Sequence, residues 1–244
     1  MIRPDLHAPL FGLSSDERVL VIAPHPDDET LGCGGTIARL TAAGVTVAVL
    51  VATVGPIHHH NDGNIIEPAL REAEFTKACA TLGVETAHIA WPDEPGDLDI
   101  TTQQRRLVDL IDHDSDLSVV TFQPTVLFIP AAGAFHQDHD AVHRAAFAAA
   151  RPRPANGPAA PRIVLGYRGG AETAWSRGAE RWPLSVDTSR HWATKESALS
   201  CYSSQIPSEG HPRAISQICA IDRATGGAIG VEYAETFCPY RFVC

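Results

Sequence analysis

A histidine and three carboxylates stand side by side near the start of the chain, in the segment Pro24–Glu29 with the sequence PHPDDE. Adjacent carboxylates repel one another and lose hydration when they are buried, so this arrangement is costly. A bound divalent cation reverses the cost, because imidazole and carboxylate are among its preferred ligands. Helix capping explains one or two of these carboxylates but explains the whole run poorly. The segment therefore predicts a metal site.

A second polar cluster, His136 to His139 with the sequence HQDH, supplies further ligands. His25 and Asp28 are three residues apart, so in a tight turn both side chains face the same point. His139, at the opening of a predicted helix, provides a third ligand. Two histidines and one aspartate with an open fourth position are typical of a catalytic zinc site rather than a structural one.

Acid–base groups lie beside these proposed ligands. Asp27 is next to the position of a zinc-activated water and is placed to take its proton as general base. His136 is placed to protonate the leaving group or to stabilise an oxyanion. Asp138 is a natural hydrogen-bond partner for one of the imidazoles, fixing its tautomer.

Alternating strands and helices must position both clusters. The apolar runs 18–24, 45–54, 85–91 and 125–130 predict buried strands, and periodic segments at 29–43, 67–82, 101–113 and 140–150 predict helices. This alternation predicts an α/β fold: an open, mostly parallel, Rossmann-like sheet with helices on both faces. Ligands of such a sheet bind at the carboxyl ends of its strands, where both clusters fall.

The last third of the chain is less regular. It contains a Pro/Ala-rich linker at 151–161, a predicted strand at 162–167 and an edge strand at 182–186. A helix at 190–201 and a terminal strand or hairpin at 233–242 follow. We find no repeat and no second domain, so residues 1–244 are expected to form a single domain with an N-terminal extension at 1–17.

Composition excludes several classes of protein. Nineteen basic and twenty-nine acidic residues give a net charge of −10, which disfavours nucleic acid as a partner. No run is long enough to insert across a membrane, and no signal-type segment opens the chain. Six cysteines without a C-x-x-C pair suit reduced thiols, so we expect a cytoplasmic location. The sequence does not specify an oligomeric state.

Together the two clusters, with Gly32-Cys33-Gly34-Gly35 between them, resemble the PIG-L or LmbE-like family of zinc-dependent N-acetylglucosaminyl deacetylases. Weaker similarities extend the resemblance over most of the chain: Arg71 with Glu74, Lys195 followed by Ser204-Gln205, and Glu235-Thr236-Phe237. The glycines do not fit a dinucleotide-binding loop, because Ile37 stands where a third glycine is needed, and we expect them to allow close helix packing instead.

The resemblance implies a reaction and roles for individual residues. One zinc ion (or another divalent transition metal) falls on His25, Asp28 and His139, the general base on Asp27, and the second catalytic histidine on His136. Substrate contacts fall on Arg71 and Asp93. The implied reaction is hydrolysis of the N-acetyl group of an amino sugar, with release of acetate and a free amine. The expected substrate is a small soluble glycoside, such as an intermediate of antibiotic biosynthesis.

Some features depart from the family pattern or leave alternatives open. Some members carry a tyrosine where this chain has Ala134, and Gln137 replaces a common proline. The loop containing His58-His59-His60 matches no family motif; it is a surface loop, a weak metal site or a cover for the substrate. A non-hydrolytic nucleotide- or metal-binding module holding Mg²⁺ is the alternative function, although Mg²⁺ favours all-oxygen ligands.

Overall fold

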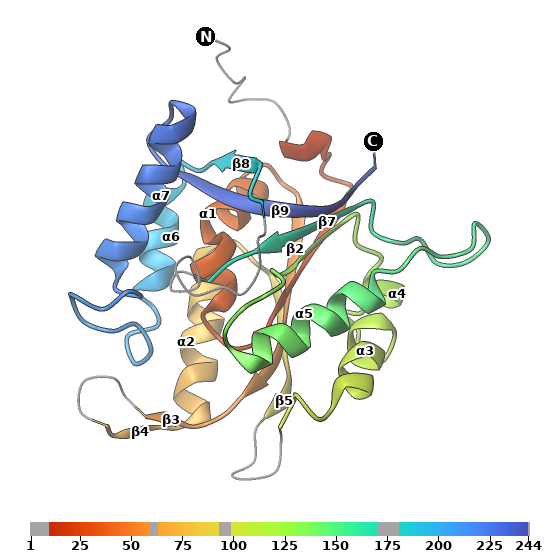
Figure 1. The fold of residues 1–244 in the computed structure, drawn as a ribbon, viewed down its shortest axis with the longest axis horizontal. Helices are drawn as coiled ribbons and strands as arrows, with labels where there is room; N and C mark the ends of the chain where they lie inside the picture. Colours follow the sequence, from red (N-terminus) through yellow and green to blue (C-terminus); the bar gives the residue numbers. More distant parts are fainter. Residues whose placement is uncertain (1–9, 59–62, 93–98, 170–180, 244) are drawn as a thin grey trace.

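A computed structural model of the protein describes residues 10–58, 63–92, 99–169 and 181–243. Within these ranges, seven strands form one sheet in the order β5-β2-β1-β6-β7-β9-β8 (Figure 1). The strands are β1 (Arg18–Ala23), β2 (Thr46–Val54), β5 (Thr86–Pro92), β6 (Val126–Pro130), β7 (Ile163–Tyr167), β8 (Leu184–Asp187) and β9 (Ala234–Phe242). A separate short hairpin contains β3 (Ile57–His58) and β4 (Ile65–Ile66).

The sheet is mostly parallel, as the sequence predicts. β5, β2, β1, β6 and β7 run parallel to one another. β9 is antiparallel to β7 on one side and to β8 on the other. The predicted terminal strand, β9, therefore lies inside the sheet. The predicted edge strand, β8, forms the edge of the sheet beside it.

Helices cover both faces of the sheet, which confirms the predicted class (Figure 1). One face packs against α1, α2 and α6, and the other against α3, α4 and α5. The helices are α1 (Asp28–Ala42), α2 (Pro68–Thr81), α3 (Gln104–Asp112), α4 (Val119–Phe122), α5 (Gln137–Ala149), α6 (Trp192–Leu199) and α7 (Ile215–Ile229). α7 lies outside α6 and beside β9 (Figure 1).

Several boundaries differ from the sequence prediction. α3 begins at Gln104 rather than near residue 101, because Asp99 accepts hydrogen bonds from Thr101 in a turn that precedes the helix. α5 begins at Gln137 rather than at residue 140, so part of the second cluster belongs to the helix itself. The helices α4 and α7 are not among the predicted elements. Residues 151–161 contain no helix or strand and connect α5 to β7.

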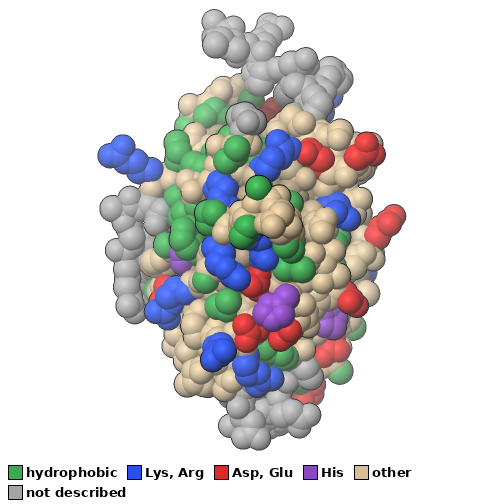
Figure 2. Space-filling model, turned by 90° about the vertical axis from the view of Figure 1, so that its right-hand side faces the viewer, with side chains coloured by type: hydrophobic (Ala, Val, Ile, Leu, Met, Phe, Trp, Pro, Cys, Tyr) green, Lys and Arg blue, Asp and Glu red, His purple; other side chains and the backbone are tan. Residues whose placement is uncertain are grey.

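The surface carries charges of both signs. On the face turned toward the viewer in Figure 2, Lys and Arg side chains are interspersed with Asp and Glu. Among the described helices, none is both long and apolar enough to cross a membrane. The described cysteines, Cys33, Cys79, Cys201, Cys219 and Cys238, are all free thiols.

Candidate metal centre and its surroundings

The two polar clusters meet because they follow neighbouring parallel strands. β1 pairs in parallel with β6, with Val19 opposite Val126. The first cluster follows β1 and the second follows β6, so both lie at the carboxyl end of the sheet, where open α/β sheets bind ligands. The structure thus brings His25, Asp28 and His139 within reach of one cation: their ligand atoms all lie within 4.8 Å of one another.

The two donor distances from Asp28 match those of a tetrahedral metal site. The Asp28 Oδ2 atom lies 3.4 Å from His25 Nδ1 and 3.2 Å from His139 Nε2. Metal–ligand bonds of about 2.0–2.2 Å in a tetrahedral site place neighbouring ligand atoms about 3.3–3.5 Å apart. The residues present therefore suit a zinc-like ion in both chemistry and spacing.

The two imidazoles lower the pKa of Asp28. Burial acts to raise the pKa of this carboxyl, but His139 and His25 outweigh it, and the net shift is strongly downward. For His25, burial acts to lower the pKa, while hydrogen bonds with Asp138 and Asp28 raise it above its ordinary value. The buried carboxylate is thus held in the charged form that a cation requires.

Asp138 binds the far side of the His25 ring. Its Oδ2 lies 2.9 Å from His25 Nε2, while Nδ1 of the same ring faces Asp28. This is the pairing that fixes the tautomer of a metal-binding histidine. The geometry thus links Asp138 to His25 in the way the sequence suggests.

His136 is the more exposed histidine of the cluster. It is the N-cap residue of α5, and its Nδ1 accepts a hydrogen bond from the Asp138 backbone N–H. Its side chain is 42% exposed, against 9% for His139. Burial and the two neighbouring histidines lower its pKa. Its other ring nitrogen is therefore the one available to exchange a proton with a ligand.

Asp27 is held in a strained backbone conformation. Its φ of 115° and ψ of −28° are unfavourable for a residue with a Cβ, and such strain concentrates at functional sites. Its backbone N–H donates to Glu29 Oε2 at 3.3 Å. Burial, together with the adjacent Asp28, raises the pKa of its carboxyl to about 6. A buried carboxyl with a raised pKa beside a metal site suits a general base.

Two arginines lie near Asp27. Arg71 is buried, and its Nε and Nη1 atoms donate to Gln205 Oε1 at 2.8 Å and to the Gly55 carbonyl at 2.7 Å. Arg213 Nη1 lies 3.6 Å from Asp27 Oδ2, and its side chain is 25% exposed. Arg213 is not among the site residues predicted from the sequence. No local pattern marks it, because its partner Asp27 lies far away along the chain.

The other predicted positions are described only in part. Asp93 lies outside the described residues, as do His59 and His60. His58 is exposed, and its Nδ1 lies 3.1 Å from the Gly63 carbonyl. Ala134 is buried. The substrate contact of Asp93 and the function of the histidine loop therefore stay predictions.

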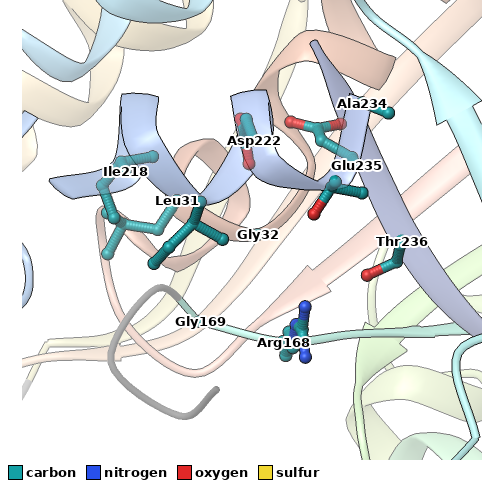
Figure 3. Close-up of a pocket in the computed structure, with 11 residues that line it drawn as sticks. Leu31, Gly32, Arg168, Gly169, Ile218, Asp222, Ala234, Glu235 and Thr236 are labelled. Carbon is teal, nitrogen blue, oxygen red and sulfur yellow. The ribbon is translucent and has the colours of Figure 1, made fainter. Parts of the chain in front are cut away.

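A buried cluster of charged side chains is hydrogen-bonded to the backbone of α1. Lys195 Nζ is 2.7 Å from both Asp222 and Glu235, and Glu235 accepts from the backbone N–H groups of Gly35 and Thr36 at 2.8 Å. Both N–H groups follow the interruption of α1 at Cys33, where φ is −148°, so Glu235 stabilises the start of the helical segment after the interruption. Asp222 and Glu235 also line the hollow in Figure 3, beside Arg168 and Thr236.

The glycines of α1 allow the close packing that the sequence suggests. A Cβ on Gly32 would lie 2.2 Å from the Tyr167 ring, and one on Gly35 would lie 2.8 Å from Thr188. Neither position tolerates a side chain without displacing its neighbour. The interpretation of these glycines as packing residues rather than a phosphate loop is therefore confirmed.

Comparisons with known proteins agree with this geometry. The family model described as "PIG-L: GlcNAc-PI de-N-acetylase" matches residues 20–150, more than half of the chain. A 1D-myo-inositol 2-acetamido-2-deoxy-alpha-D-glucopyranoside deacetylase of Actinosynnema mirum is 44% identical over 86 residues. That alignment covers 30% of this chain and 29% of the relative, so the chain spans under a third of that protein.

Solved structures show the same fold. The conserved protein TT1542 of Thermus thermophilus has a TM-score of 0.71 and 30% identity, covering 93% of this chain and 96% of that one. GalB, a 4-carboxy-2-hydroxymuconate hydratase of Pseudomonas putida, has a TM-score of 0.66 at 18% identity, covering 92% and 96%. Since a hydratase shares the architecture, the fold alone does not decide the reaction.

Proposed function

This chain belongs to the PIG-L family, and on that premise we propose that it is a zinc-dependent hydrolase that removes the N-acetyl group from an N-acetylglucosamine-type amino sugar. The observation that carries the proposal is the clustering of His25, Asp28 and His139 around one point, with the buried carboxylate of Asp27 in the adjoining position. The two donor distances from Asp28 match a tetrahedral site. The deacetylase relative supports the choice of an acetylated sugar as substrate.

His25, Asp28 and His139 would hold one zinc ion. The ion supplies Lewis acidity, polarising the amide carbonyl and lowering the pKa of water. Asp27 takes the proton of the attacking water as a carbon–oxygen bond forms. His136, exposed and with its Nδ1 already occupied, gives a proton to the nitrogen as the carbon–nitrogen bond breaks. Asp27 then returns its proton to His136 through solvent, and the second proton of the water ends on the amine. One water is consumed, acetate and an ammonium ion leave, and both side chains regain their starting protonation.

Asp138 contributes by holding His25. A hydrogen bond to Nε2 keeps the proton on that nitrogen and leaves the Nδ1 lone pair for the cation. The alternative of a Mg²⁺-holding, non-catalytic module is less well supported, because two of the three donors are imidazoles and Mg²⁺ prefers oxygen.

The cellular setting belongs to the same proposal. The five free thiols support a reducing compartment, and we propose the cytoplasm.

Measurement of acetate release from a panel of N-acetylglucosaminides by the zinc-loaded protein tests the proposal. We expect release from at least one member, loss of activity on chelation, and recovery on addition of zinc. Asp27→Ala should abolish turnover while the protein retains one zinc per chain. Asp140→Ala is the control, because that carboxylate lies in the first turn of α5, beside the second cluster, but its side chain is 40% exposed and pairs with Arg144.

Two outcomes contradict the proposal. Absence of zinc under every loading condition removes the metal site. Zinc binding without acetate release, together with hydration of an unsaturated acid, assigns the chain to the chemistry of the hydratase that shares its fold.

A further inference from the structure

The segment between α6 and α7 holds a guanidinium over the Asp27 carboxylate. Arg213, two residues before α7, approaches Asp27 Oδ2 to 3.6 Å through Nη1. This distance exceeds that of a normal N–H···O hydrogen bond, so the interaction is one of charge. The Arg213 side chain is 25% exposed and that of Asp27 is 6%, which places the guanidinium on the solvent side of the carboxylate.

The position of Arg213 is fixed by its own contacts. Its Nη2 donates to the Gln205 carbonyl at 3.2 Å, and its backbone N–H donates to His211 Nδ1 at 3.1 Å. Gln205 is 1% exposed. Its side-chain amide accepts a hydrogen bond from Arg71 and donates one to Glu74 at 3.0 Å. The segment is therefore fastened to α2, and Arg213 occupies a defined place over the site.

Asp27 needs such a partner. Its carboxylate adjoins that of Asp28, and like charges at this range push one another apart. Its backbone is strained, and Glu29 restrains only the N–H group. Among the described residues, the ion pair within 4 Å that reaches the Asp27 side chain is the one with Arg213. Arg213 thus opposes the repulsion that would turn the carboxylate away.

We propose that Arg213 is a positioning residue for deacetylation, holding the Asp27 carboxylate in one direction from the solvent side. The inference rests on the proposed function, in which Asp27 takes a proton from the attacking water. The simpler reading is a structural one, in which Arg213 only fastens the segment through Gln205. The two readings differ in what happens when the guanidinium is removed and a free one is supplied.

The test compares the zinc-loaded Arg213→Met, Arg213→Lys and Arg213→Ala proteins on a substrate that the wild-type protein deacetylates. Arg213→Met should lower kcat by about 10- to 100-fold, because small misplacements of a catalytic group have effects of this size, with KM within about threefold. Arg213→Lys should recover part of this loss, since lysine supplies the charge without the planar fork. The zinc content and Tm of all three should stay near the wild-type values.

Chemical rescue separates positioning from support of the fold. Guanidinium chloride at non-denaturing concentrations should raise kcat of Arg213→Ala, whereas sodium chloride at the same ionic strength should not. Arg223→Met is the matched control: this arginine is exposed on α7, and its removal should change neither kcat nor the response to guanidinium.

Three results would overturn the inference. Wild-type kcat in Arg213→Met, with acetate release by the wild-type protein intact, removes the role of Arg213 and leaves the proposed function standing. Loss of activity that follows a fall in Tm or zinc content, without rescue, assigns Arg213 to structural support. Absence of acetate release by the zinc-loaded wild-type protein overturns the proposed function and this inference together.

Discussion

The Tyr202 hydroxyl donates a 2.5 Å hydrogen bond to the Glu29 carboxylate, across 173 residues of sequence. Both side chains are fully buried. Glu29 also accepts from the Thr30 hydroxyl at 2.6 Å and from the backbone N–H of Asp27. Burial raises the pKa of this carboxyl to about 7. Glu29 therefore supports the strained Asp27 backbone and is not placed as a metal ligand.

Tyr202→Phe should lower the free energy of unfolding by about 1–3 kcal/mol, because it leaves a buried carboxyl without its strongest donor. Urea denaturation at neutral pH measures the change. Tyr233→Phe is the control: its hydroxyl lies 4.0 Å from Cys219 Sγ, so its loss should cost less than about 0.5 kcal/mol. Equal effects of the two substitutions would contradict the role assigned to Tyr202.

Asp138→Asn should weaken zinc binding by about 10- to 100-fold, as loss of the partner of a metal-binding histidine commonly does. The asparagine keeps the size of the side chain but no longer offers a carboxylate to His25 Nε2. Competition with a fluorescent chelator gives the affinity, and Asp140→Asn provides the comparison. Unchanged zinc affinity would show that Asp138 does not contribute to metal binding through His25.

Arg71→Met should lower the free energy of unfolding by about 2–4 kcal/mol, because Gln205 and Gly55 lose a buried charged donor. Arg105→Met, at an exposed position of α3, should change stability by less than about 0.5 kcal/mol. Direct contact of Arg71 with substrate stays a prediction, and a rise in KM with the stable Arg71→Lys protein would favour it. A fully stable Arg71→Met protein would show that the buried hydrogen bonds carry little weight.

Asp222→Asn should make stability less dependent on pH. Burial, together with the charge of Glu235, raises the pKa of Asp222 to about 6, although Lys195 acts to lower it. The folded protein therefore favours the protonated carboxyl, and this contribution, fully present below the unfolded pKa near 4, is lost as the pH rises through 6. Relative to the wild type, the variant should gain about 1 kcal/mol in unfolding free energy between pH 5 and pH 7.5. Denaturation curves at both pH values measure this difference, and a constant difference would contradict it.

Local patterns predicted the half of the molecule that holds the metal site. The apolar runs before Pro24 and before Ala131 identified β1 and β6, and a parallel sheet then required that the polar clusters after them meet. The buried histidines and carboxylates could be predicted because their types and spacing are specific to metal binding. The antiparallel insertion of β9 between β7 and β8 could not be predicted, because strand order depends on packing between distant segments.

Long-range contacts account for the rest of what the sequence did not indicate. The contact of Arg213 with Asp27 joins residues at opposite ends of the chain, and no local pattern marks an arginine in a turn. α7 escaped prediction because its C-terminal half contains Gly226 and Gly227, residues that lower helix propensity. Gly226 is required there, since a Cβ would lie 2.7 Å from the Glu232 backbone.

Glu235, whose carboxylate accepts hydrogen bonds from the backbone of the interrupted α1, lies 200 residues after Gly35 in the sequence. At a synthesis rate of about 5–20 residues per second, roughly 10–40 s of translation separate the two. A nascent chain thus carries every proposed zinc ligand while the helix beneath them still lacks Glu235 and its partner Lys195. The ribosome-bound protein is therefore expected to become active only when β9 has emerged and entered the sheet.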